Sequence, residues 1–429
     1  MIYFVVLAIL AVCVSTQVFL VRKLGIAGLV NNPVSLLIVF FEIIHLLVPV
    51  LQWYQGYFRY SNNYDEYLYI LSIIIAFFLF IFYSFFFILY LNYFTSTKKH
   101  LISIDTRNSK IFLSLTSMIF FIGFYFSFGN IISIQSAGYE NYLSDRIGFS
   151  EGSGYKVIFA HWVYVSCILF YVGYLVGNLK RIFFFAFIIS LIYCFIYYGL
   201  NSNRNSLFIL VINLIVFYIY LSKSKRKNVL GNTFKLTIVG FSIYIFYLIG
   251  KFRNTAFSSV EVDYGLSRSL NGAFGNHENI VWLISNDFNY LWAKTYLAGF
   301  LNLIPRFIWA EKPFGAGPEL KNMIYPGSYV IGQEGNSSLT TGLLTESIMN
   351  FGVLGSLPAL FLISILVVLL LRYFKNLKNP FGIVIYIYLF TLLSTQFLYA
   401  EFLGFYTRTL FTSVPIFLLL FFVKFQRKV

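Results

Sequence analysis

The sequence predicts an all-α protein that crosses a membrane many times. Of its 429 residues, 59% are hydrophobic and only 11% are charged, which is too little charge to cover a soluble surface of that size. The apolar residues are gathered in runs of about twenty, the length that a helix needs to cross the hydrocarbon core. Aromatic residues make up 21% of the chain, and their rings suit the headgroup boundary and contact with lipid.

The apolar runs predict about eleven spans. They lie near 1–21, 33–53, 67–94, 111–134, 157–177, 182–200, 206–222, 236–250, 349–371, 380–400 and 409–423. This pattern divides the chain into spans one to eight (1–250), a large polar loop (251–341) and spans nine to eleven (342–429). No basic leader precedes the first span, so we expect it to be retained rather than cleaved.

Basic residues in the short loops predict the orientation. Nineteen lysines and arginines follow the odd-numbered spans, against five in the short loops after the even-numbered spans. Because basic loops stay in the cytoplasm, we expect a multi-pass membrane protein with its amino terminus outside and its carboxy terminus in the cytoplasm. The large loop between spans eight and nine is then extracytoplasmic.

The same distribution excludes other classes of function. A net charge of +15 would suggest nucleic acid in a soluble protein, but here the positive charge is topological, so we expect no nucleic-acid partner. Cys13, Cys167 and Cys194 lie inside apolar spans without paired spacing, which favours neither disulfides nor a metal site.

The large loop combines a helical pattern with an ordered irregular segment. Apolar residues recur at helical spacing over 280–296, which predicts a helix in the membrane interface or packed on the bundle. From Pro305 to Gly335 the loop is dense in proline and glycine, interleaved with aromatic anchors. Such a composition is typical of an ordered loop rather than a linker.

Basic residues on the outer side have no topological explanation. A guanidinium group grips phosphate oxygens with two parallel hydrogen bonds, so a cluster of them predicts a phosphate or pyrophosphate ligand. Arg306, which follows a proline in the structured loop, is the candidate for a catalytic role. The candidates for binding pyrophosphate are Arg204, Lys251, Arg253, Arg268, Lys312 and Arg408.

Several groups could carry a proton. His277 and Glu278 are a histidine and a carboxylate next to each other within the loop. A histidine is a natural general base near neutral pH. Glu346 stands at the entrance of span nine, where a carboxylate needs a partner, a cap or a catalytic use. Other outer carboxylates, Glu311, Glu319, Glu334 and Glu401, stay open as carriers. Because the sequence has neither an HExxH nor a Walker motif, we predict no metal and no cofactor.

Two runs of residues resemble the bacterial oligosaccharide repeat-unit polymerases of the Wzy type, which build O-antigen and capsule. The first is Pro305-Arg306-Phe307-Ile308-Trp309-Ala310-Glu311-Lys312-Pro313, and the second is Glu346-Ser347-Ile348-Met349-Asn350-Phe351-Gly352. Arg306 and Gly317 also have the arginine–ten–glycine spacing of some such polymerases, although no second copy of that spacing occurs. The resemblance covers about fifty residues, and the rest of the chain matches only in hydropathy.

The resemblance implies a metal-independent glycosyltransferase of the bacterial cytoplasmic (inner) membrane. It would transfer the growing glycan from undecaprenyl pyrophosphate to a new lipid-linked repeat unit, with arginines stabilising the leaving pyrophosphate. The expected partners are lipid-linked glycans, membrane lipids, a chain-length regulator and a flippase. An O-antigen ligase that delivers glycan to a lipid A core is the alternative. A transporter of lipid-linked glycans is a further alternative, although it would carry charges through its spans.

Overall fold

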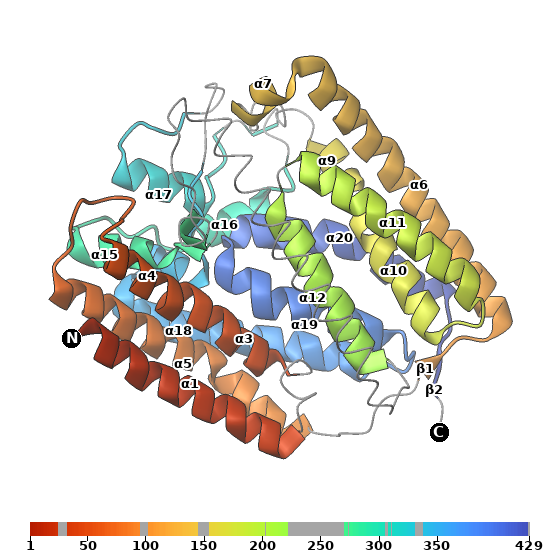
Figure 1. The fold of residues 1–429 in the computed structure, drawn as a ribbon, viewed down its shortest axis with the longest axis horizontal. Helices are drawn as coiled ribbons and strands as arrows, with labels where there is room; N and C mark the ends of the chain where they lie inside the picture. The colour runs from red at the N-terminus through yellow and green to blue at the C-terminus, as the bar shows by residue number, and fades with distance from the viewer. Residues whose placement is uncertain are drawn as a thin grey trace. The chain divides into compact units, whose positions relative to one another are not determined.

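The computed structural model is built almost entirely from helices (Figure 1). It describes residues 1–24, 32–94, 102–144, 154–201, 203–221, 270–272, 274–304, 308–309, 311–330 and 338–427. Nine helices in these residues are long and apolar enough to cross a membrane, and a tenth apolar helix, Asn205–Leu221, is shorter. The predicted all-α polytopic fold is therefore confirmed. The predicted eighth span, 236–250, lies outside the described residues.

The chain forms two compact units. The first contains residues 1–97, 270–372 and 390–409, and the second contains 98–269, 373–389 and 410–429. The three last long helices contribute to both units: α18 (Leu343–Lys375), α19 (Gly382–Tyr399) and α20 (Phe402–Phe422). Each unit is described by itself below.

The first unit begins with three spans. They are α1 (Ile2–Leu24), a second span made of α3 (Pro33–Glu42), the π-helix η1 (Ile43–Leu47) and α4 (Val48–Gln55), and α5 (Glu66–Phe94). Asn32 caps α3 by accepting the N–H of Val34 at 2.9 Å, and Pro33 fits the first helical position, where no N–H is needed. The second span ends at Gly56, whose φ of +61° favours glycine.

The described part of the large loop folds onto this unit. It supplies three short helices, α15 (His277–Ser285), α16 (Lys294–Leu301) and α17 (Ala316–Ile324). The prediction of a single helix over 280–296 is wrong, because the non-helical residues 286–293 separate α15 from α16. α15 contacts α4 and α5 (Figure 1), and an ion pair of 2.8 Å between Lys294 and Glu319 joins α16 to α17.

The second unit is a bundle of the remaining spans. It contains α6 (Thr106–Ala137), α7 (Tyr139–Ser144), α9 (Gly154–Ala160), α10 (Trp162–Val176), α11 (Lys180–Leu200) and α12 (Arg204–Leu221). α10 packs against α6, α11 and α12. Gly123 lets α6 approach α10 closely, since a Cβ there would lie 2.5 Å from the backbone nitrogen of Val163.

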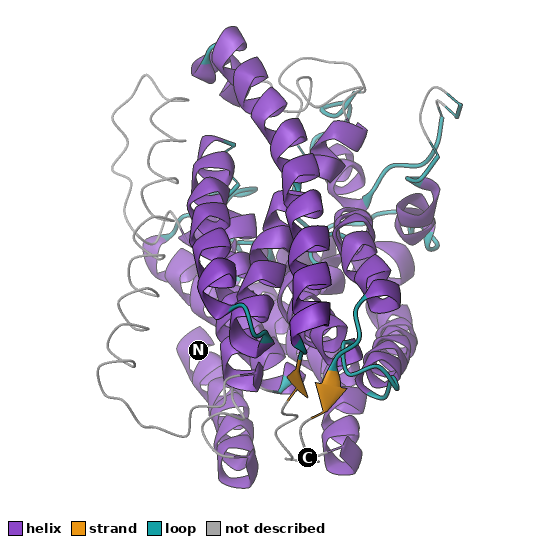
Figure 2. Ribbon diagram, turned by 90° about the vertical axis from the view of Figure 1, so that its right-hand side faces the viewer, coloured by secondary structure: helices purple, strands orange, loops and turns teal. Residues whose placement is uncertain are grey.

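A small antiparallel ladder closes one end of this bundle. β1 (Ile102–Ser103) pairs with β2 (Gln426–Arg427), as Figure 2 shows near the C label. Both segments follow odd-numbered spans, which are predicted to lead into the cytoplasm. In the first unit, the Met1 amino group lies 2.8 Å from Glu66. The start of span one and the start of span three, both predicted to be outside, therefore lie at the same end of this unit. These pairings agree with the predicted alternation, while the side that faces the cytoplasm stays a prediction.

Candidate functional site

Glu278 is enclosed by hydrogen-bond donors from the end of the second span and from the loop after it. Its side chain is fully buried, and its Oε1 accepts the backbone N–H groups of Arg59 at 2.7 Å and Tyr60 at 2.9 Å. Tyr64 donates to the same oxygen, and Gln52 donates to Oε2 at 3.2 Å. Burial raises the pKa of Glu278, and the N–H groups of Arg59 and Tyr60 oppose that rise. This carboxylate therefore fastens the loop after span two to α15.

His277 is also fully buried, and both of its ring nitrogens have partners. Ser72 donates its only proton to the carbonyl of Tyr69 at 2.6 Å, so its 2.9 Å contact with His277 Nε2 requires a proton on Nε2. The bare Nδ1 then accepts the Nδ1–H of His45 at 3.1 Å. Burial lowers the pKa of His277 to about 3. The ring is a neutral link between α15, the π-helix and α5.

Glu346 joins the start of α18 to two other helices. Its carboxylate is fully buried; Oε1 accepts the hydroxyl of Thr295 at 2.7 Å, and Oε2 accepts the backbone N–H of Phe402 at 2.6 Å. Phe402 is the first residue of α20, where N–H groups lack partners inside the helix. Glu346 thus caps α20 and also holds α16.

Glu401 immediately precedes Phe402 and holds a third helix. Its Oε2 accepts the backbone N–H of Gly317 in the first turn of α17 at 2.6 Å, a favourable position for a carboxylate. A Cβ at Gly315 would lie 2.8 Å from this oxygen, so glycine permits the close approach. Burial raises the pKa of Glu401, and the N–H of Gly317 opposes that rise.

α18 is interrupted six residues, or nearly two turns, after Glu346. Gly352 has a φ of +69° and a ψ of 178° inside the helix, which frees the carbonyls of the preceding turn. The N–H groups of Leu291 and Trp292 bind the carbonyls of Met349 and Asn350, both at 3.0 Å. Trp292 and the following residue adopt left-handed φ values of 47° and 66°, which strain a residue other than glycine. The segment before α16 is therefore inserted into the break.

Two predicted pyrophosphate ligands are described in this unit. Lys312 is 7% exposed, and its ammonium group donates to the carbonyl of Ile304 at 2.8 Å and to the Oδ1 of Asn302 at 3.2 Å. In this structure it binds the turn that follows α16. Arg408 lies in α20 about two turns after Phe402 and is partly exposed.

The other predicted ligands cannot be placed. Lys251, Arg253, Arg268 and Arg306 lie outside the described residues. Arg204 begins α12 in the second unit, but its side chain is not among those described. Of the four predicted catalytic residues, the structure therefore brings His277, Glu278 and Glu346 into one unit, on α15 and α18.

Sequence reasoning missed several partners of these groups. Arg59 donates from its guanidinium group to the carbonyl of Asn271, and its backbone binds Glu278. It is the one basic residue of its outer loop, so the argument that singled out Arg204 and Arg408 applies to it equally. Thr295 carried no signal, because its contact with Glu346 spans 51 residues of sequence.

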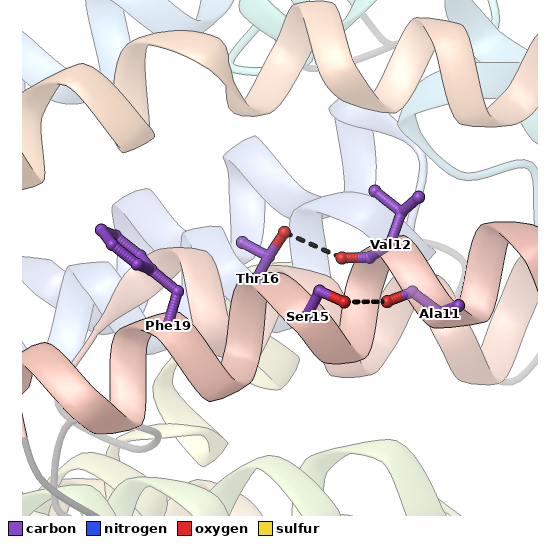
Figure 3. A pocket seen from close by; sticks show the side chains of 5 residues that line it. All are labelled: Ala11, Val12, Ser15, Thr16 and Phe19. Carbon is purple, nitrogen blue, oxygen red and sulfur yellow. Dashed lines mark hydrogen bonds between the residues drawn. The ribbon is translucent and has the colours of Figure 1, made fainter.

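A shallow groove on α1 does not belong to this network. It is lined by Ala11, Val12, Ser15, Thr16 and Phe19 (Figure 3). The two hydroxyl groups donate to carbonyls of their own helix, Ser15 to Ala11 at 2.6 Å and Thr16 to Val12 at 2.9 Å. The groove offers no charged group for a reaction.

No group of three or more His, Cys, Asp or Glu side chains in the described ranges could hold a metal ion. Comparison with known protein families, curated proteins and solved structures finds no match to this chain.

Proposed function

We propose that this protein polymerises oligosaccharide repeat units carried on undecaprenyl pyrophosphate, by transferring the glycan from one carrier lipid to the repeat unit on another at the extracytoplasmic face of the cytoplasmic membrane. The observation that carries the proposal is a meeting of two sequence runs at the junction of α19 and α20. Gly317, with the arginine–ten–glycine spacing from Arg306, binds Glu401. Glu346, which begins the second run, binds Phe402 beside it.

The arrangement suits a reaction at the membrane surface. Glu346 and Glu401 fix α16 and α17 of the large loop to the ends of spans, and Arg306 lies between these two helices in the sequence. Arginine there would stabilise the negative charge that develops on a leaving pyrophosphate. The contact between arginine and pyrophosphate accelerates the reaction because it is stronger in the transition state, where the negative charge develops, than with the bound substrate.

Exposed apolar side chains beside the site fit a lipid-linked substrate. Trp292 is 75% exposed, and Leu297 and Phe300 on α16 are 53% and 52% exposed. Leu297 and Phe300 are three residues apart and share one face of the helix. Such a face favours the headgroup and acyl boundary of a bilayer, where a carrier lipid would present its pyrophosphate.

Deletion of the gene in its host tests the proposal. We expect single lipid-linked repeat units to reach the surface while long chains disappear, and wild-type protein to restore the long chains. Accumulation of long polymer on the carrier lipid would instead identify a ligase that delivers glycan to a lipid A core. Complete loss of repeat units from the outer face, with intact units retained inside, would identify a transporter.

Substitution of Arg306 tests the residue that the proposal depends on most. Arg306→Ala should abolish chain extension at normal expression, because one charged donor to the leaving group is lost. Arg306→Lys should restore little, since an ammonium group cannot make the paired hydrogen bonds of a guanidinium. Wild-type chain length in the alanine variant would contradict the assignment.

A further inference from the structure

The acid and base groups of the outer loop differ in whether they can accept a proton from a substrate. His277, Glu278 and Glu346 are fully buried. Both ring nitrogens of His277 have partners, both oxygens of Glu278 accept N–H groups, and both oxygens of Glu346 accept donors. Each of these groups is occupied in holding the fold.

Glu401 differs in having one bound and one open oxygen. Oε2 is fixed by the N–H of Gly317, while Oε1 accepts no hydrogen bond from the part of the chain that the structure describes. The side chain is partly exposed. A general base needs this combination, because one atom must be held in place while the other reaches the proton.

The position of Glu401 fits the proposed substrate. It occupies the turn between α19 and α20, where Glu346 and Glu401 fix α16 and α17, and Arg408 follows on α20 about two turns later. A sugar attached to a membrane-borne pyrophosphate would lie just outside such span ends. The predicted phosphate ligand and the open carboxylate oxygen then belong to the same helix and its cap.

We propose that Glu401 is the general base of the glycosyl transfer, an inference that rests on the proposed function. Oε1 takes the proton from the acceptor sugar hydroxyl as that oxygen forms a bond to the anomeric carbon of the donor. The bond between the anomeric carbon and the pyrophosphate oxygen breaks, and its electron pair leaves with undecaprenyl pyrophosphate. The proton then passes from Glu401 to solvent, and no metal ion or redox partner is required for the balance.

Glu401→Gln tests this role without removing the structural contact. The glutamine carbonyl can accept the N–H of Gly317 in place of Oε2, and the amide nitrogen then occupies the position of Oε1, where it cannot take a proton. Membranes from the deletion strain, carrying each variant, would be supplied with lipid-linked repeat units extracted from that strain, and chain growth followed on gels. Asp287→Asn is the matched control, because Asp287 is an exposed carboxylate between α15 and α16.

We expect Glu401→Gln to slow chain growth by about 100-fold or more, the usual contribution of a general base, with unchanged protein level and heat resistance. Glu401→Asp should recover part of the rate, and Asp287→Asn should grow chains as the wild type does. A Gln variant that grows chains within about threefold of the wild-type rate overturns the assignment while leaving the polymerase intact. Failure of the wild-type protein to extend chains overturns the proposed function, and the role of Glu401 with it.

Discussion

The carboxylate of Glu346 accepts the backbone N–H of Phe402 at 2.6 Å. This bond joins the first turn of α18 to the first residue of α20, across 56 positions of sequence. The same carboxylate accepts the hydroxyl of Thr295, whose oxygen also accepts the amide of Asn350 at 2.7 Å. The buried carboxyl group thus has donors at both oxygens, which is the condition under which such a group is tolerated at the end of a span.

Removal of this carboxylate should destabilise the protein. Glu346→Ala leaves the N–H of Phe402 and the hydroxyl of Thr295 without their acceptor, and each unsatisfied buried group costs about 1–3 kcal/mol. We expect a clearly lower temperature of aggregation for the detergent-solubilised protein, measured by fluorescence-detected gel filtration after heating. Thr295→Val removes one of the two donors and should cost less. Equal heat resistance of the alanine variant and the wild type would contradict the capping role.

The break in α18 should depend on glycine at position 352. Gly352→Ala places a Cβ at a φ of +69° and 2.8 Å from the Cζ and hydroxyl oxygen of Tyr290. With a ψ of 178°, this backbone conformation is essentially restricted to glycine and costs alanine about 1–3 kcal/mol. We expect reduced heat resistance in the same gel-filtration measurement.

Two further variants separate the causes at this break. Gly199→Ala is the control, because Gly199 lies in α11 with nothing within 4 Å of its added Cβ, and alanine favours helix. Gly352→Ala combined with Tyr290→Ala should recover only the part of the loss that comes from the clash. Full heat resistance of the single Gly352 variant would show that the break does not need glycine.

The spans could be predicted from the sequence, because hydropathy over twenty residues is a strong local signal. Nine long apolar helices and the shorter Asn205–Leu221 correspond to predicted spans one to seven and nine to eleven. The ends were less certain: α18 starts at Leu343, six residues before the predicted 349. Polar residues such as Glu346 lower the hydropathy there, although they are paired and buried.

The geometry of the site could not be predicted in the same way. The apolar pattern over 280–296 fits one helix, yet Trp292 and Ala293 take left-handed conformations where the N–H groups of Leu291 and Trp292 bind the broken turn of α18. Local propensity disfavours that conformation for both residues. The sequence identified Glu401 as a carboxylate on the outer side but gave no indication of its partner, since its contact with Gly317 crosses 84 residues. Such contacts appear only when distant segments are placed together.

Lys312 should contribute to stability more than an exposed lysine of the same loop. Its buried ammonium group donates to Ile304 and Asn302, so Lys312→Met leaves those oxygens without this donor at a cost of about 1–3 kcal/mol. Lys294→Met is the matched control, because it removes the exposed lysine of the ion pair with Glu319; surface ion pairs are typically worth about 1 kcal/mol or less. Heat resistance of both variants after detergent extraction measures the difference. A larger loss in the Lys294 variant would contradict the structural role of Lys312.

The buried pair of His277 and His45 should make the protein sensitive to acid. Burial lowers the pKa of His277 from the usual 6.5 to about 3, so below pH 6.5 the unfolded chain binds a proton that the folded state excludes. The contribution of neutral His277 to the free energy of unfolding is therefore fully present above about pH 6.5. It is lost as the pH decreases toward 3, by at most about 5 kcal/mol at 1.4 kcal/mol per pH unit. His277→Gln should lower stability at pH 7.5, where the hydrogen bonds to His45 and Ser72 are lost. It should also flatten the dependence between pH 7 and 5, because glutamine does not titrate. Unfolding of the purified protein at a series of pH values measures both effects, and an unchanged slope in the glutamine variant would contradict this assignment.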